Sequence, residues 1–128
     1  MRLADLKKAS SVAVHFAHSG EVDERVNTLG LSVLEGSVAE VKTDKELFSV
    51  VAEAMKFPDY FGNNWDALDE CLSDLDWLPV DGYLLILRDA GKGWSRDPYL
   101  LGCFVTAWLE SAEYWVEKQT PFHLIFVI

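Results

Sequence analysis

The sequence predicts an α/β domain with a largely parallel sheet, because apolar segments of strand length alternate with segments that have helical periodicity. Residues 83–87 and 122–128 are continuous apolar runs, a pattern typical of strands buried on both faces. The chain has 128 residues, 50% of them hydrophobic, and is long enough to bury a core without disulfides or a structural metal. We expect one domain that spans residues 1–128.

The amino-terminal part of the chain alternates between strand-like and helix-like segments. Residues 11–17 are β-branched and aromatic, which predicts a strand, and residues 21–29 are compatible with a short helix that Gly30 ends. Residues 31–41 resume a strand-like pattern, although Gly36 interrupts it. A strand, a helix and a second strand are therefore expected in this order.

Three later segments have helical periodicity. Thr43, with Glu46 three residues further on, has the pattern of a capping box, and Pro58 is expected to end the helix that begins there. A second helix is predicted over residues 64–76. A third, long helix is predicted between residues 97 and 121, with a proline in its first turn.

Charge and cysteine usage limit the possible functions. The chain carries 21 acidic against 11 basic residues, a net charge of -10, which disfavours nucleic acid and anionic lipid as direct partners and fits a basic partner better. The sequence shows no signal-like segment and no run of about 18 apolar residues, so we expect a cytoplasmic protein without membrane contact. Cys71 and Cys103 lie among apolar neighbours without CxxC spacing and are expected to be reduced, buried thiols.

The most informative segment is residues 57–79, where aromatic, amide and acidic residues surround one short predicted helix. At about 100° per residue, the polar residues lie opposite the apolar ones: Asp66, Asp69, Glu70 and Ser73 face outward, and Leu68, Cys71, Leu72 and Leu75 face inward. Tyr60, Phe61 and Trp65 stand beside the acids and are not all accounted for by core packing. Gly62 is expected to adopt a positive φ that turns this loop alongside the helix. Carboxylates next to aromatic rings are typical of the centre of a protein interface.

The same segment resembles the central signature of the barstar family of ribonuclease inhibitors. The family pattern is FPxYFGxNWDALxDCL, and this sequence has FPDYFGNNWDALDECL at residues 57–72. Agreement in the order of elements extends the resemblance from the strand before Thr43 to Ile128. Residues 1–30 are similar to an amino-terminal βα extension present in some longer relatives.

The resemblance implies a barstar-like fold, a small, mainly parallel sheet of three to four strands flanked by helices. It also implies an inhibitor that places the acidic helix and the preceding loop in a ribonuclease active site. The implied partner-binding positions are Tyr60, Phe61, Gly62, Asn64, Trp65, Asp66, Asp69, Glu70, Ser73 and Trp77. Glu70 stands where the best known member has an Asp that enters the phosphate site, and Trp77 follows the helix at a longer spacing than in the family.

The implied mechanism replaces phosphate by carboxylate. A carboxylate at the right position occupies the phosphate site of the enzyme by accepting charge-assisted hydrogen bonds from its cationic side chains. The expected partner is a basic secreted or toxin ribonuclease in a 1:1 complex, with no cofactor and no direct contact with nucleic acid. The net charge adds electrostatic steering.

Two other classes of function remain open. An enzyme would use Asp66 and Glu70 as acid and base, but no nucleophile beside a base accompanies them. His15 and His18 would point to opposite faces of a strand, and His123 is expected to be a satisfied core or edge residue. The second class is an immunity protein of the same fold, in a toxin–antitoxin pair whose toxin is a deoxyribonuclease or another enzyme. Glu70 and the extended amino terminus are the features that favour it.

Overall fold

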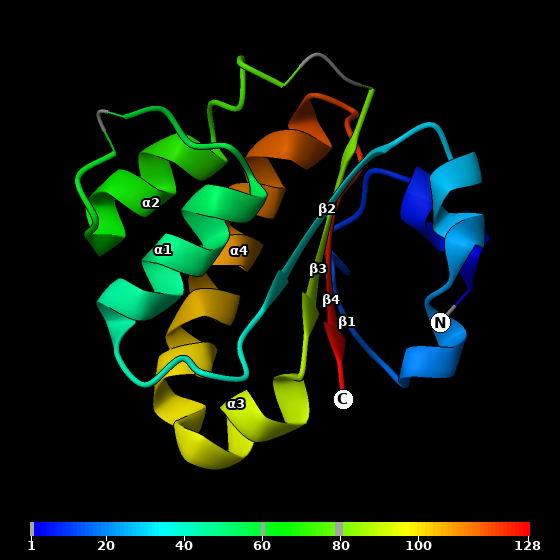
Figure 1. Ribbon diagram of the computed structural model, residues 1–128. Helices are drawn as coiled ribbons and strands as arrows, with labels where there is room; N and C mark the ends of the chain where they lie inside the picture. Colours follow the sequence, from blue (N-terminus) through cyan, green and yellow to red (C-terminus); the bar gives the residue numbers. More distant parts are fainter. Residues whose placement is uncertain (1, 60, 79–80) are drawn as a thin grey trace.

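A four-stranded sheet forms the middle layer of the computed structural model, which describes residues 2–59, 61–78 and 81–128. Its strands are β1 (Val14–Ala17), β2 (Ser32–Ser37), β3 (Tyr83–Arg88) and β4 (Phe122–Val127), in the order β1-β4-β3-β2, and every neighbouring pair is parallel. The α-helices cover one face of this sheet and the amino-terminal segment covers the other (Figure 1). The predicted mainly parallel sheet flanked by helices is confirmed.

The two central strands are buried on both faces, as their apolar runs predict. All six residues of β4 and the first five of β3 are buried. Side chains alternate along each strand, so Leu85 and Leu124 belong to the core under the helices, whereas Leu84 and Ile125 belong to a second core on the other face. The sheet therefore needs cover on both sides.

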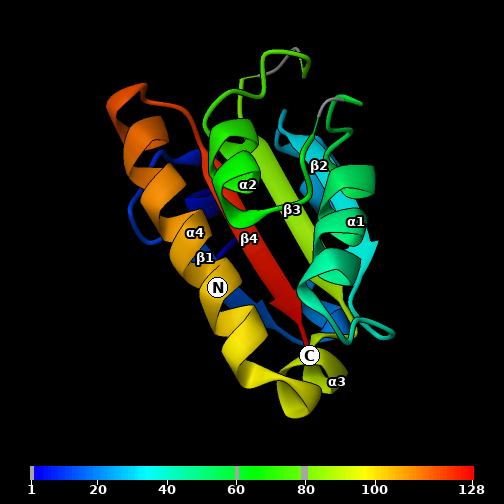
Figure 2. The ribbon, with the colours of Figure 1, turned by 90° about the vertical axis from the view of Figure 1, so that its left-hand side faces the viewer.

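Four α-helices supply the cover on the first face: α1 (Asp44–Ala54), α2 (Trp65–Leu72), α3 (Ala90–Arg96) and α4 (Pro98–Glu117). Figure 2 shows α4 over the β4 and β1 side of the sheet and α1 over the β2 side. Beneath them, Trp108 of α4 stacks on Phe122 of β4 with ring centroids 4.0 Å apart, the shortest such distance among the described residues. Among the described residues, no helix combines the length and the apolar character needed to cross a lipid bilayer.

The capping signals read from the sequence are present, but helix α1 ends earlier than predicted. The Thr43 hydroxyl accepts the Glu46 N–H at 3.1 Å, while the Glu46 carboxylate accepts from the backbone N–H of Lys42. The helix ends at Ala54, because Lys56 adopts a left-handed conformation with φ of 56°. Its end is set by this turn and not by Pro58.

Helix α3 was not predicted. It follows Asp89, which has φ of 59°, and it contains two glycines, which lower helix propensity. A Cβ atom on Gly93 would lie 2.9 Å from the side chain of Val38, the residue that follows β2. Close packing, and not local propensity, therefore fixes this helix.

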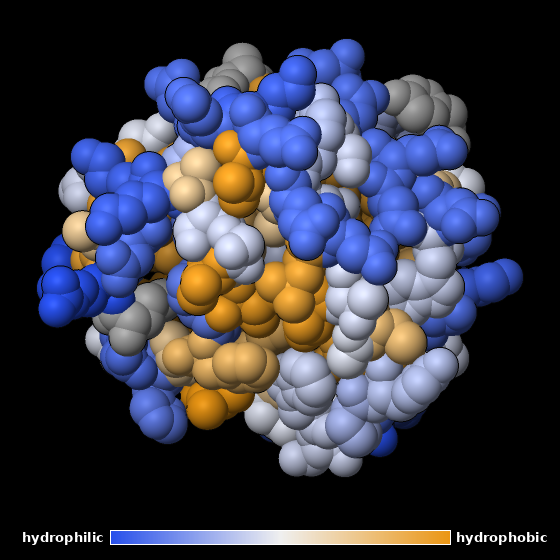
Figure 3. Space-filling view, turned by 180° about the vertical axis from the view of Figure 1, so that it is seen from behind, coloured by the Kyte–Doolittle hydropathy of each residue, from blue (hydrophilic) through white to orange (hydrophobic). Residues whose placement is uncertain are grey.

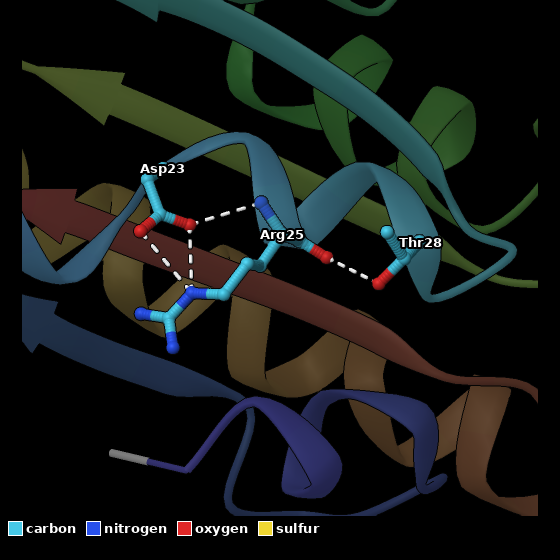
Figure 4. A network of polar contacts seen from close by, with 3 residues as sticks. All are labelled: Asp23, Arg25 and Thr28. Carbon is cyan, nitrogen blue, oxygen red and sulfur yellow. Dashed lines mark hydrogen bonds and ion pairs between the residues drawn. The ribbon is translucent and has the colours of Figure 1, made fainter.

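The amino-terminal segment contains β1 and three 3-10 helices, η1 (Leu3–Lys7), η2 (Ser19–Glu21) and η3 (Glu24–Thr28). The α-helix expected over residues 21–29 is therefore wrong in type. Figure 4 shows the local hydrogen bonds of η3: the Asp23 carboxylate caps its start by accepting from both the backbone N–H and the Nε–H of Arg25, and the Thr28 hydroxyl at its end donates to the Arg25 carbonyl. The segment buries Leu6, Ala17, Val22 and Val26 against the second core.

A histidine pair joins β1 to β4 on this second face. His15 Nε2 lies 2.9 Å from His123 Nδ1, and His123 Nε2 lies 2.7 Å from the Lys8 carbonyl oxygen. The carbonyl only accepts, so His123 Nε2 donates to it, and in the neutral pair His123 Nδ1 accepts from His15. The expectation that His123 is a satisfied core residue agrees with its 1% exposure.

This pair predicts a loss of stability in mild acid. Partial burial, followed by the proximity of His123, lowers the pKa of His15 to about 4, and burial also lowers the pKa of His123. Between about pH 6.5 and 4 the unfolded chain therefore binds more protons than the folded one, so the free energy of unfolding falls as the pH falls. In urea titrations, His15→Gln should reduce this fall by about 1 kcal/mol after allowance for the half-exposed ring.

Glutamine still donates a hydrogen bond to His123, which makes His15→Gln a mild substitution. The carboxylates also make the free energy of unfolding depend on pH, but they do so equally in the variant and in the parent chain. The difference between the two proteins therefore reports the contribution of His15. Equal pH dependence in the two proteins would contradict the assignment.

Candidate functional site

The acidic helix α2 is fixed at its start by Asn64. The Asn64 side-chain oxygen accepts the Ala67 N–H at 2.8 Å, and its Nδ2 donates to the Gly62 carbonyl at 3.3 Å. This is the position that the family pattern assigns to the helix-start Asn. The cap joins the loop to the helix, so both present their side chains as one unit.

The turn before α2 differs from the expectation. The residue with a positive φ is Asn63, at 53°, and not Gly62. Asparagine tolerates this conformation better than other residues with a Cβ. A Cβ on Gly62 would lie 3.3 Å from Asn64 Nδ2, so this glycine leaves room for the capping side chain.

Removal of the cap tests this arrangement. Asn64→Ala is expected to lower the free energy of unfolding by about 1 kcal/mol, because one N–H at the helix start loses its acceptor. Asn64→Asp, which retains the acceptor, is the matched control and should cost less. Urea denaturation followed by circular dichroism measures both, and an equal loss in the two variants would contradict the capping role.

The acidic side chains of α2 are distributed over two directions. Asp66 and Glu70, one turn apart, are exposed, whereas Asp69 and Ser73 are half-buried. Ser73 also caps the end of the helix, its N–H donating to the Asp69 carbonyl. Burial, and then the charges of Glu110 and Asp66, raise the pKa of Asp69.

No carboxylate of α2 is neutralised by a neighbouring cation within the chain. Across residues 2–59, 61–78 and 81–128, the ion pairs are Lys8–Asp5, Arg25–Asp23 and Arg88–Glu35, which all lie outside this helix. The negative potential of Asp66 and Glu70 is therefore available to a partner.

Phe61 and Trp65 are packed on the core more than expected. The edge of Trp65 meets Phe48 at a centroid distance of 4.9 Å, and Phe61 meets Phe48 at 6.2 Å and Phe57 at 5.0 Å. Phe48 itself is only 1% exposed. Both rings remain half-buried, so one side of each contacts the core while the rest faces solvent. They serve as rigid anchors of the loop.

Trp77 lies beyond the end of α2 and packs on the same group of rings. Its centroid is 5.9 Å from that of Phe57, and its Nε1 donates to the Met55 carbonyl at 3.0 Å. Helix α2 ends at Leu72, before the predicted Asp76, and the buried Leu75 adopts φ of 53° in the segment that returns toward Trp77. Tyr60, the other predicted aromatic, lies outside the described residues.

A groove of about 580 Å³ adjoins α2 on the side that faces α4. It brings Asp69 and Trp65 together with residues that sequence reasoning missed. The groove is lined by Asp44, Trp65, Asp69, Asp97, Tyr99, Leu100, Cys103, Thr106, Ala107 and Glu110. Glu110 and the 81% exposed Tyr99 lie on the polar side of α4, but only the packing of the two helices shows that they share a surface with α2.

The two cysteines are free thiols, as expected, but they differ in burial. Cys71 is buried in α2, and burial, followed by the charges of Asp74 and Glu70, raises the pKa of its thiol. Cys103 is half-exposed in the groove wall, so the prediction of two buried thiols is wrong for this residue.

The arrangement suits recognition of a cationic surface. Asp66 and Glu70 offer carboxylate oxygens that accept charge-assisted hydrogen bonds, and half-buried rings adjoin them. Within the described ranges, no three His, Cys, Asp or Glu side chains are gathered in a way that would hold a metal ion.

Comparison with known proteins assigns the chain to a family. No curated protein matches the sequence. The family model described as Barstar (barnase inhibitor) matches residues 31–127, which begin just before β2 and extend through β4. Barstar-family proteins are inhibitors rather than enzymes. This match spans most of the 128 residues, and the chain therefore belongs to the barstar family.

Proposed function

We propose that this protein inhibits a basic ribonuclease by covering its active site with α2 and the loop that precedes it. The observation that carries the proposal is the pair of exposed carboxylates of Asp66 and Glu70 on one face of a capped helix, where no cation of the described residues forms an ion pair with them. In the free protein these like charges, at i and i+4, repel each other by a few tenths of a kcal/mol. This repulsion lowers the stability of the helix in the free protein, and a cationic partner that binds both carboxylates would remove it.

The mechanism is competitive occupation of the phosphate site. The partner's Arg, Lys and His side chains would donate to Asp66 and Glu70 as they would to the phosphate of RNA. Phe61, Trp65 and Trp77 already contact the core, so little conformational freedom is lost when they exclude water around these charge pairs. The positions Tyr60, Gly62, Asn64, Asp69 and Ser73 complete the proposed contact surface.

The groove beside α2 extends this surface. Burial, followed by the charge of Glu110 in the same groove, raises the pKa of Asp69. A partner's cationic side chain placed between them would remove this repulsion. The net charge of -10 would increase the association rate with a basic enzyme at low ionic strength.

The proposal is tested by titrating the full chain into RNA cleavage reactions of a panel of basic ribonucleases, with any nuclease encoded beside its gene included. Inhibition that is complete at one inhibitor per enzyme is the expected result. A parallel series with basic deoxyribonucleases examines the immunity-protein alternative. Inhibition of a deoxyribonuclease alone, or of no nuclease in either series, would refute the assignment.

A further inference from the structure

The edge of the sheet formed by β1 carries an uncovered apolar strip. Val12 is 69% exposed, Phe16 53% and Leu109 38%. The strip consists of Val12, Val14 and Phe16 at the edge and of Trp94, Val105 and Leu109 from the adjoining helices. Figure 3, which shows the face with the β1 edge, has hydrophobic residues gathered at its centre. Clusters of this kind are typical of interfaces, whereas single exposed apolar residues are not.

The backbone of this edge is also available. Leu124 and Ile128 of the β4 segment donate to the carbonyls of Ala13 and Ala17. Because backbone groups alternate along a strand, the N–H and C=O of Val14 and Phe16 point away from β4. In the part of the chain that the structure describes, β1 pairs with β4 alone. An open edge with apolar side chains is a template for another strand.

The charge distribution favours a second copy of this chain as the occupant. Residues 9–20 contain no Asp, Glu, Lys or Arg in a chain that carries 32 such residues. Two copies with a net charge of -10 can therefore approach through this edge with little repulsion. Lys7 and Lys8 precede the strand, and Glu21 and Asp23 follow it, so antiparallel approach brings the basic end of each strand toward the acidic end of the other.

We propose that the protein forms a dimer in which the two β1 strands pair antiparallel and extend the sheet across a two-fold axis. Val14 and Phe16 of each copy would exchange backbone hydrogen bonds with those of the other. A two-fold axis perpendicular to the sheet keeps both α4 helices on one face, where Val105 and Leu109 of each copy cover the apolar strip. Helix α2 lies on the other side of α4 from this strip, so both inhibitory surfaces stay open.

Light scattering after size-exclusion chromatography of the full chain tests the proposal. The expected mass is twice 14.4 kDa at high protein concentration. Val14→Pro removes an N–H that the fold itself does not use, and Pro is tolerated at such edge positions. It should raise the dimer dissociation constant about tenfold or more, because both symmetry-related hydrogen bonds are lost. Val12→Lys, which places a charge in the strip, should have the same effect.

The matched control is Ser49→Lys, which adds the same charge to an exposed position on α1, over the β2 side of the sheet. It should dimerise like the parent chain. If Val14→Pro fails to fold by circular dichroism, Val12→Lys decides the result. A parent mass of 14.4 kDa at every concentration would overturn the proposal. Equal dimer dissociation constants for the control and the edge variants would overturn it as well. So would hydrogen exchange at the Phe16 amide that is as fast at high protein concentration as at low concentration.

Discussion

Phe48→Ala should lower the free energy of unfolding by about 3–5 kcal/mol and weaken inhibition in the fraction that remains folded. Phe48 is buried in α1 and is the ring on which both Phe61 and Trp65 rest edge-on. Its truncation removes the core contact that holds the loop and the first turn of α2. The binding surface would then be ordered only on association, which costs affinity.

A matched control separates the two effects. Phe104 in α4 is equally buried and contacts Trp108 rather than the loop. Phe104→Ala should lose similar stability while inhibition per folded molecule is retained. Folded fractions come from circular dichroism, and inhibition from RNA cleavage. Equal inhibition constants for the two variants would show that Phe48 supports only the core.

Much of the fold is visible in local sequence patterns. The continuous apolar runs of β3 and β4 predict central strands because only a doubly covered strand tolerates such composition. Thr43, Asn64 and Asp97 mark helix starts because each cap is made within three residues along the chain. Local hydrogen bonds of this kind do not depend on the rest of the fold.

The elements that were missed depend on tertiary packing. Helix α3 has weak intrinsic propensity and is fixed by the contact of Gly93 with Val38. The 3-10 helices η2 and η3 lie on the second face of the sheet, where burial of Val22 and Val26 determines the path of the chain. Periodicity reports which side of a segment is apolar, but not which hydrogen-bond pattern its backbone adopts.

The candidate site, like the fold, has features that local sequence predicts and features that depend on tertiary packing. Helical periodicity correctly placed Asp66 and Glu70 on the exposed face of α2, because that inference needs only the geometry of one helix. The groove that joins Asp69 to Glu110 depends on how α2 and α4 pack, which the spacing of residues in either helix does not reveal. The anchoring of Phe61 and Trp65 on Phe48 is likewise a long-range contact.

Asp66→Ala and Glu70→Ala are each expected to weaken inhibition by about 2 kcal/mol or more, roughly 30-fold, as is typical when one partner of a buried charge pair is truncated. The typical losses on which this expected value is based include measurements on a barstar-family complex. They therefore set the scale of the effect without supporting the prediction independently. The fold should be unaffected, because relief of the repulsion between the two carboxylates offsets the loss of favourable Asp66 charge at the helix start. Dissociation rates and inhibition constants, measured beside urea denaturation, test both statements.

Glu53→Ala is the matched control, because it removes one exposed carboxylate from α1 without touching the proposed surface. It should slow association slightly at low salt and leave the dissociation rate unchanged, since a charge outside the contact acts only through steering. Glu70→Asp tests whether the length of the side chain at this position matters for binding. If the partner's site fits the longer Glu, the dissociation rate of this variant should be higher. If Asp66→Ala and Glu70→Ala behave like Glu53→Ala, the acid pair contributes only net charge and another surface must contact the enzyme.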